Sequence, residues 1–201
     1  MHSGARMFAA SPLVRGHVME SLFTLVRSLG VEIPAASRPI ASVVARLPYA
    51  WVDDAHFLDT LYAAAQRHGD FAFRAGYVAA KSQLSGDGAL ADVLLAARSD
   101  VGALAHAMSA CFTGLGELVC ASTDPMCTTF VHQGECSPTL LRYLTGWLTA
   151  GLEAAGARVT ALMSMQRMPA LGTHAHALRC AWSREPPSSP RGATLELLAA
   201  T

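Results

Sequence analysis

The 201-residue chain has few charged residues and only one lysine, Lys81. Charged residues make up 15% of the chain, against roughly a quarter in typical proteins. Its 15 basic residues balance its 15 acidic residues, so nothing in the composition favours nucleic acid or an anionic membrane surface as a partner. This low charge is typical of a large buried interior, or of a surface that meets an apolar ligand or a protein partner.

The chain also lacks a secretion signal, a membrane-spanning run and any CxxC pair. Five cysteines, an odd number, in a chain of this length argue against a disulfide framework. The most apolar predicted helix carries Arg142 and Glu153, and the stretch between them is too short to cross a bilayer. We therefore expect a bacterial protein of the cytoplasm with no membrane span.

Residues 11–116 show helical spacing of apolar residues almost throughout. Ser11 and Pro12 are typical of an N-cap followed by a first-turn proline, and Gly30 is typical of a helix end. His17 lies in the apolar stripe of the helix predicted between Pro12 and Gly30. Further helices are predicted at about 40–46, 53–69 and 71–84, and in two segments of 89–116 that break near residues 99–100.

After Gly116 the pattern changes to short β-rich runs. The runs 117–123 and 127–134 are separated by Asp124 and Pro125, which is typical of a hairpin. A helix is predicted from Ser137 to Gly156, and its small residues Gly146, Ala150 and Gly151 predict a close approach to a sheet. The runs 157–167 and 174–182 then predict a second hairpin.

Together these patterns predict an α+β fold, with a helical N-terminal half packed on a small antiparallel sheet. The C-terminal half reads helix–hairpin–helix–hairpin. We expect a flexible N-terminus at 1–10, a single ligand-binding-like domain at 11–182, and a Pro/Ser-rich tail at 183–201.

Three stretches carry a resemblance to known families: PLVRGHVMESLFTLV, DDAHFLDTLYAAAQRHG and SPTLLRYLTGWLTAGLEAAGARV. With them the chain resembles a family of uncharacterised proteins found mainly in myxobacteria. More distantly, its C-terminal half is similar to the fold shared by haem-nitric-oxide-binding domains, 4-vinyl-reductase-like ligand domains and TRAPP trafficking subunits. This resemblance implies binding of a hydrophobic ligand or a partner protein, rather than catalysis.

The resemblance also bears on cofactors. The haem sensors of this group carry a Tyr-x-Ser-x-Arg signature, which this sequence does not contain. TRAPP subunits can carry an acyl chain on a cysteine, and the resemblance makes Cys111 the conceivable analogue. We therefore expect no cofactor, with zinc or haem as the alternatives.

The run LGTHAHALRCAW contains a candidate metal site. On a strand His174, His176 and Cys180 share one face, where two imidazoles and a thiolate could hold zinc or iron. His132, on the first hairpin, could supply a further ligand. The alternative is a polar stripe that faces water, because one face of such a sheet usually does.

Apolar residues of the helices and the second hairpin predict a cavity between the helical half and the sheet. Its expected lining is Phe112, Leu115, Leu144, Trp147, Leu148 and Met163. Cys111 and His17 are further candidates. Their structural alternatives are a small buried hydrophobe for Cys111 and a half-buried imidazole bonded to a backbone carbonyl for His17. Core packing is the alternative for the methionine.

Motifs that carry catalysis are absent from the sequence: it has no GxSxG, no HExxH, no phosphate-binding glycine loop and no dinucleotide fingerprint. We therefore expect a non-catalytic regulatory or sensory domain that binds a small hydrophobic ligand. The alternatives are a protein–protein interaction module, possibly homodimeric, and a metal- or haem-binding protein that uses His174 and His176.

Overall fold

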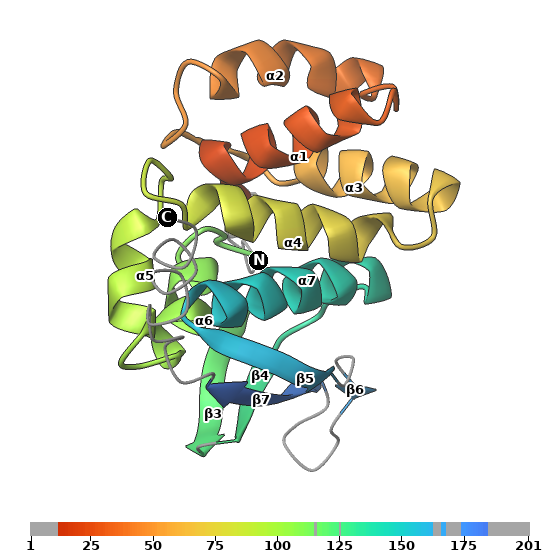
Figure 1. The fold of residues 1–201 in the computed structure, drawn as a ribbon. Helices are drawn as coiled ribbons and strands as arrows, with labels where there is room; N and C mark the ends of the chain where they lie inside the picture. The colour runs from red at the N-terminus through yellow and green to blue at the C-terminus, as the bar shows by residue number, and fades with distance from the viewer. Residues whose placement is uncertain (1–11, 115, 125, 163–165, 168–173, 185–201) are drawn as a thin grey trace, which may run out of the picture.

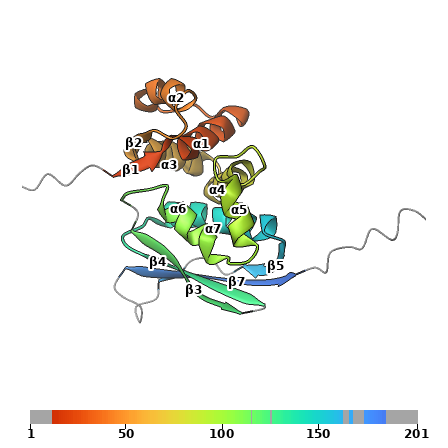
Figure 2. The ribbon, with the colours of Figure 1, turned by 90° about the vertical axis from the view of Figure 1, so that its left-hand side faces the viewer.

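The computed structural model describes residues 12–114, 116–124, 126–162, 166–167 and 174–184. It is an α+β fold with helices in the N-terminal half and an antiparallel sheet in the C-terminal half, which confirms the predicted class. Figures 1 and 2 show α1–α3 at one end of the molecule, the sheet at the other, and α4–α7 between them.

The helices lie close to their predicted positions, and a short 3-10 turn, Ala35–Ser37, precedes the second one. They are α1 (Gly16–Ser28), α2 (Arg38–Val44), α3 (Ala55–Arg67), α4 (Phe71–Gln83), α5 (Ala91–Ala97), α6 (Gly102–Ser109) and α7 (Pro138–Ala154). Ser137 caps α7 as predicted, because its hydroxyl accepts a hydrogen bond from the Leu140 N–H at 3.1 Å. None of the helices in the described ranges is long and apolar enough to cross a membrane.

The larger sheet has five strands, and its last strand lies inside it. The strands are β3 (Glu117–Asp124), β4 (Cys127–Gln133), β5 (Ala157–Leu162), β6 (Gln166–Arg167) and β7 (Ala175–Arg184). The order is β3-β4-β7-β5, all neighbours are antiparallel, and β6 also pairs with β7. Both predicted hairpins are therefore present, and β7 joins them into one sheet.

The start of the first helix was predicted wrongly. Residues Leu13–Arg15 form a strand, β1, that pairs with β2 (Trp51–Asp53), and α1 begins only at Gly16. At this point the backbones touch: a Cβ on Gly16 would lie 2.8 Å from the Leu47 carbonyl oxygen. The Gly16 N–H donates to the Ala50 carbonyl at 2.8 Å. Contacts with residues more than thirty positions away therefore determine where this helix begins, and the local pattern of Ser11 and Pro12 does not.

Helix α7 is buried along most of its length, between α4 and the sheet. Its closest neighbour is α4, because glycines let the two backbones meet. A Cβ on Gly76 would lie 1.9 Å from the Tyr143 carbonyl oxygen, and one on Gly146 would lie 2.0 Å from the Phe73 carbonyl oxygen. Gly151 faces the Leu104 side chain of α6. Gly146 and Gly151 therefore serve helix–helix contacts, and the prediction that they approach the sheet was wrong.

Candidate functional site

The interface between the helices and the sheet is packed where the sequence predicted a cavity. The side chains of Phe112, Leu144, Trp147 and Leu148 are all buried core. Phe57 fills the space beside them, because its ring packs edge-on against Phe112 at 5.4 Å and against Tyr143 at 5.1 Å. The other two predicted lining residues, Leu115 and Met163, lie outside the described residues.

Beside α7 the space found among the described residues is a hole of about 10 Å³, whereas an open pocket of about 700 Å³ lies at the edge of the sheet, between α6 and β3. Leu144, Met108 and His132 are among the lining residues of the hole. Its volume holds about one water molecule. The described residues of the predicted lining, Phe112, Leu144, Trp147 and Leu148, therefore pack as core and do not line a ligand-sized space. The pocket between α6 and β3 is lined by other residues.

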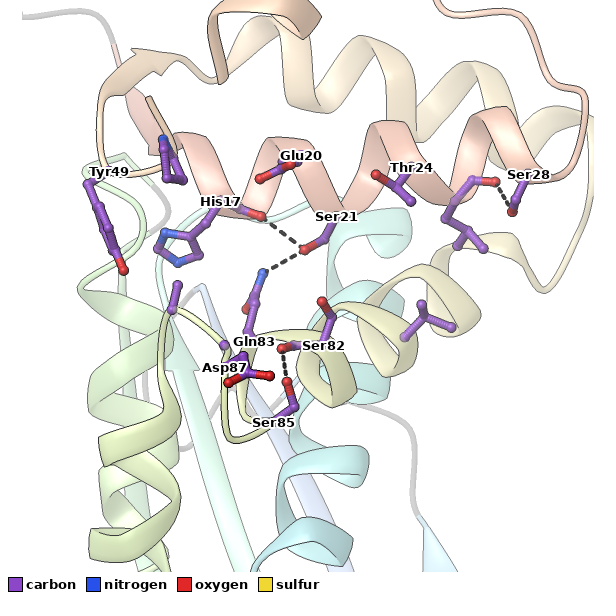
Figure 3. A pocket seen from close by; sticks show the side chains of 15 residues that line it. His17, Glu20, Ser21, Thr24, Ser28, Tyr49, Ser82, Gln83, Ser85 and Asp87 are labelled. Atoms are coloured by element: carbon purple, nitrogen blue, oxygen red, sulfur yellow. Dashed lines mark hydrogen bonds between the residues drawn. The ribbon is translucent and has the colours of Figure 1, made fainter. Parts of the chain in front are cut away.

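Another cleft, of about 540 Å³, lies between α1 and the C-terminal end of α4 (Figure 3). We call it the α1–α4 cleft. Residues 17–28 of α1 form one wall, the end of α4 with the loop to residue 89 forms the other, and Pro48 and Tyr49 close one end. A cleft of this size is in the range that proteins use for small molecules.

His17, one of the predicted ligand residues, lies in the wall of this cleft. Its side chain is only 7% exposed, and Nδ1 has no hydrogen-bond partner. Nε2 lies 3.5 Å from the Sγ of Cys111. Burial is the largest effect and lowers the pKa of His17 below 6.5; the nearby Pro48 backbone raises it in part, without meeting hydrogen-bond geometry at Nδ1, and the positive charge of Arg15 lowers it further. The imidazole is therefore neutral near pH 7.

Cys111 lies behind His17 and does not line the cleft. Its side chain is buried, and burial raises the pKa of the thiol to about 12. The neutral imidazole beside it does not supply the positive charge that would stabilise a thiolate. Cys111 thus packs as a small buried group. The acyl-carrier role implied by the TRAPP resemblance stays a prediction.

Gln83 connects the cleft to the core, and sequence reasoning missed it. Its side chain is 2% exposed, and its Nε2 donates to the Ser21 hydroxyl at 3.3 Å. Its Oε1 accepts from the indole Nε1–H of Trp147 at 2.9 Å. Ser21 in turn donates to the His17 carbonyl at 2.9 Å. The one sequence signal was a lone amide in a helix whose other buried residues are apolar or glycine.

Two of the four candidate metal ligands come together. His132 and His176 are paired across β4 and β7, with ring centroids 6.3 Å apart. His132 is buried, as is Cys180 further along β7, so the alternative of a water-facing polar stripe is wrong for these two residues. Burial along β7 alternates from Leu178 to Ser183, but not from Ala175 to Ala177.

The other two candidates lie elsewhere. Cys180 pairs with Thr128 on β4, and burial raises its thiol pKa to about 12. His174 is exposed, and its Nε2 lies 4.0 Å from the Glu135 carboxylate. Within the described ranges no three His, Cys, Asp or Glu side chains are gathered so that they could hold a metal. The structure thus does not assemble the predicted four-residue set.

Comparison with known proteins identifies the fold. No protein-family model and no curated protein matches the sequence. A variant H-NOX protein from S. oneidensis in the Fe(II) ligation state is 12% identical, with a TM-score of 0.55 over 86% of this chain and 98% of its own. An Fe(II) unliganded H-NOX protein from K. algicida is 10% identical, with a TM-score of 0.54 over 85% and 97%. At these identities the likeness shows the fold alone.

The fold is therefore like that of H-NOX, or haem-nitric-oxide-binding, domains, and this part of the distant resemblance is confirmed. The same comparison contradicts the expectation of no cofactor. Both of these neighbours are H-NOX proteins in an Fe(II) state, so proteins with this fold hold an iron cofactor. The myxobacterial family remains a prediction.

Haem needs a slot, an iron ligand that faces it and partners for two propionates. The described side chains do not fit it. The core beside α7 is filled by Phe57, Phe112 and Tyr143 and leaves about 10 Å³. The pocket of about 700 Å³ between α6 and β3 has two carboxylates, of Asp100 and Glu117, and no Lys or Arg among its lining residues. The α1–α4 cleft has room, but no Lys or Arg is among its lining residues to meet propionates.

Proposed function

We propose that this domain is a non-catalytic sensory or regulatory module that binds a small ligand in the α1–α4 cleft. In place of the apolar space against the sheet that the sequence predicted, the ligand site is a partly polar cleft between two helices. The H-NOX-like fold supports this proposal at the level of the class, because H-NOX domains are ligand-binding sensors.

The observation that carries the proposal is the pair of buried polar side chains at the cleft. His17 and Gln83 are 7% and 2% exposed, although burial of polar groups is unfavourable unless they are hydrogen-bonded. Gln83 is satisfied, whereas Nδ1 of His17 is not. Such an unsatisfied buried atom is uncommon and calls for an explanation. Nδ1 is shielded from solvent, so a ligand in the adjoining cleft would meet it only after a small shift of the wall.

The hydrogen-bond chain supplies a route for the signal. It runs from His17 and Ser21 on α1 through Gln83 on α4 to Trp147 on α7. Helix α7 packs on the sheet, and its backbone touches that of α4. A ligand that moves Gln83 therefore changes the hydrogen bond of a tryptophan at the centre of the molecule.

The test is to fill the cleft. Thr24 is exposed on the α1 wall, so Thr24→Trp places an indole in the cleft without disturbing the core. Ser42→Trp puts the same side chain on the exposed face of α2, away from the cleft, as the control. Native mass spectrometry of freshly purified protein should show a co-purified mass in the wild type and in Ser42→Trp, and none in Thr24→Trp.

Haemin, added to the apo protein, provides a second arm of the same experiment. A stoichiometric Soret band in the wild type would show that the chain binds haem. A haem that binds equally to wild type and Thr24→Trp, with no other co-purified mass, would contradict the cleft as the ligand site. A protein partner, homodimerisation and the cytoplasmic location stay predictions from the sequence.

A further inference from the structure

The charged groups of the α1–α4 cleft are all of one sign. Glu20 on the α1 wall and Asp87 on the opposite loop are the carboxylates of its lining, which contains no Lys or Arg (Figure 3). Neither carboxylate forms an ion pair or a hydrogen bond with any residue in the described ranges. The whole chain has no net charge, so this negative cleft is a local feature.

The basic side chain that precedes α1 has partners other than these carboxylates. Arg15 precedes α1, but its guanidinium stacks on the Trp51 ring at 3.9 Å and donates to the Tyr49 carbonyl at 2.8 Å. Both contacts lie at the end of the cleft. Among the described residues, the carboxylates of Glu20 and Asp87 are therefore left without an ion-pair partner.

Two further groups favour a positively charged ligand. The Tyr49 ring is 62% exposed at the end of the cleft, and an exposed aromatic face attracts cations. The buried imidazole of His17 also belongs to the wall, and its Nδ1, shielded from solvent, has no hydrogen-bond partner. A neutral imidazole offers a nitrogen acceptor or donor and adds no repulsion to a cation.

We infer that the α1–α4 cleft takes a small organic cation, an amine or quaternary ammonium compound, held by Glu20 and Asp87 with its charged nitrogen near the Tyr49 ring. This inference rests on the proposed function and names its ligand class. Five hydroxyl side chains along the walls would bind the polar parts of such a ligand: Ser21, Thr24, Ser28, Ser82 and Ser85.

The ligand class can be tested with probes of matched length. Isothermal titration calorimetry of the full chain would compare putrescine, the diol in which hydroxyls replace both amines, and succinate, with choline as a second cation. The cations should bind, and binding should weaken as salt is added. The diol and the dicarboxylate should give no measurable heat.

The carboxylates are tested by variants that keep their shape. Glu20→Gln and Asp87→Asn should each weaken binding of the cations about fivefold, as expected for partly exposed charge pairs. Asp59→Asn removes an exposed carboxylate of α3 outside the cleft and should leave the affinity unchanged. Circular dichroism of each variant checks that the fold is retained.

The outcomes separate the two proposals. If the diol binds as tightly as putrescine, or if both isosteric variants bind the cations like wild type, the charge assignment is overturned. A neutral or anionic mass that co-purifies with wild type and is lost in Thr24→Trp would overturn it too, yet would leave the cleft as a ligand site. No co-purified mass and no response to any probe would overturn both.

Discussion

His17 is a buried histidine in the wall of the α1–α4 cleft, and its Nδ1 has no hydrogen-bond partner. The stripe of apolar residues in the sequence predicted that His17 faces inward, and the structure confirms it. The other cleft residues could not be predicted in the same way. The walls of the α1–α4 cleft come from residues 17–28, 48–49 and 78–89, which become neighbours only after folding.

The lowered pKa of His17 makes stability depend on pH. Below pH 6.5 the unfolded chain binds a proton that the folded imidazole resists, so the free energy of unfolding should fall as the pH drops from 7 toward 5. His17→Gln should flatten this dependence by up to about 1.4 kcal/mol per pH unit, the limit for one proton. Urea unfolding at a series of pH values measures it.

Ser21→Ala is the matched control, since it changes the same helix without removing a titrating group. It should keep the wild-type slope even though it loses the hydrogen bond from Gln83. Parallel pH profiles for wild type and His17→Gln would show that burial of this imidazole does not affect stability.

Among the elements, helices and strands were predictable wherever their own sequence sets the period. The apolar stripe of α7, its Ser137–Pro138 start and the Asp124 turn all belong to this group. Strand β1 was not predictable, because its hydrogen-bond partners lie at residues 51–53. The packed core was missed for a related reason: apolar periodicity shows which residues face inward, but not whether they leave space.

The contact between α4 and α7 should be the least tolerant of any added atom. Gly76→Ala or Gly146→Ala would place a Cβ about 2 Å from a carbonyl oxygen of the other helix, and backbone atoms cannot turn aside. Each variant should lose at least about 2 kcal/mol of unfolding free energy, within the range for overpacked cores. Urea midpoints followed by circular dichroism give the values.

Gly151→Ala is the comparison within the same helix. Its Cβ would meet the Leu104 side chain at 3.0 Å, and a leucine side chain can move. The helix gains up to about 1 kcal/mol of intrinsic propensity from alanine, so the net change should be small. Equal losses at all three glycines would contradict the contact described here.

At the scale of the molecule, Gln83 is the polar link between the N-terminal helices and the centre. Gln83→Met keeps the length of the side chain but leaves the buried Trp147 N–H without its acceptor, which costs about 1–3 kcal/mol. The indole N–H resonance of Trp147, identified with Trp147→Phe, should shift strongly. Ser82→Ala, an exposed neighbour on α4, should leave both stability and resonance unchanged.

The same resonance tests the route for the signal. A probe that binds in the α1–α4 cleft should move the Trp147 signal in wild type and not in Gln83→Met. Binding that leaves this signal in place would mean that cleft occupancy does not reach α7 through Gln83.

The strand order has a consequence for the growing chain on the ribosome. The inner strand β7 emerges after β3, β4 and β5, although β4 and β5 both need it as their neighbour. Until residue 184 has left the exit tunnel, the edges of β4 and β5 that pair with β7 in the folded sheet have unpaired backbone amides. Such unpaired edges can pair wrongly with another nascent chain. Translation that pauses before Ala175 would prolong that exposure.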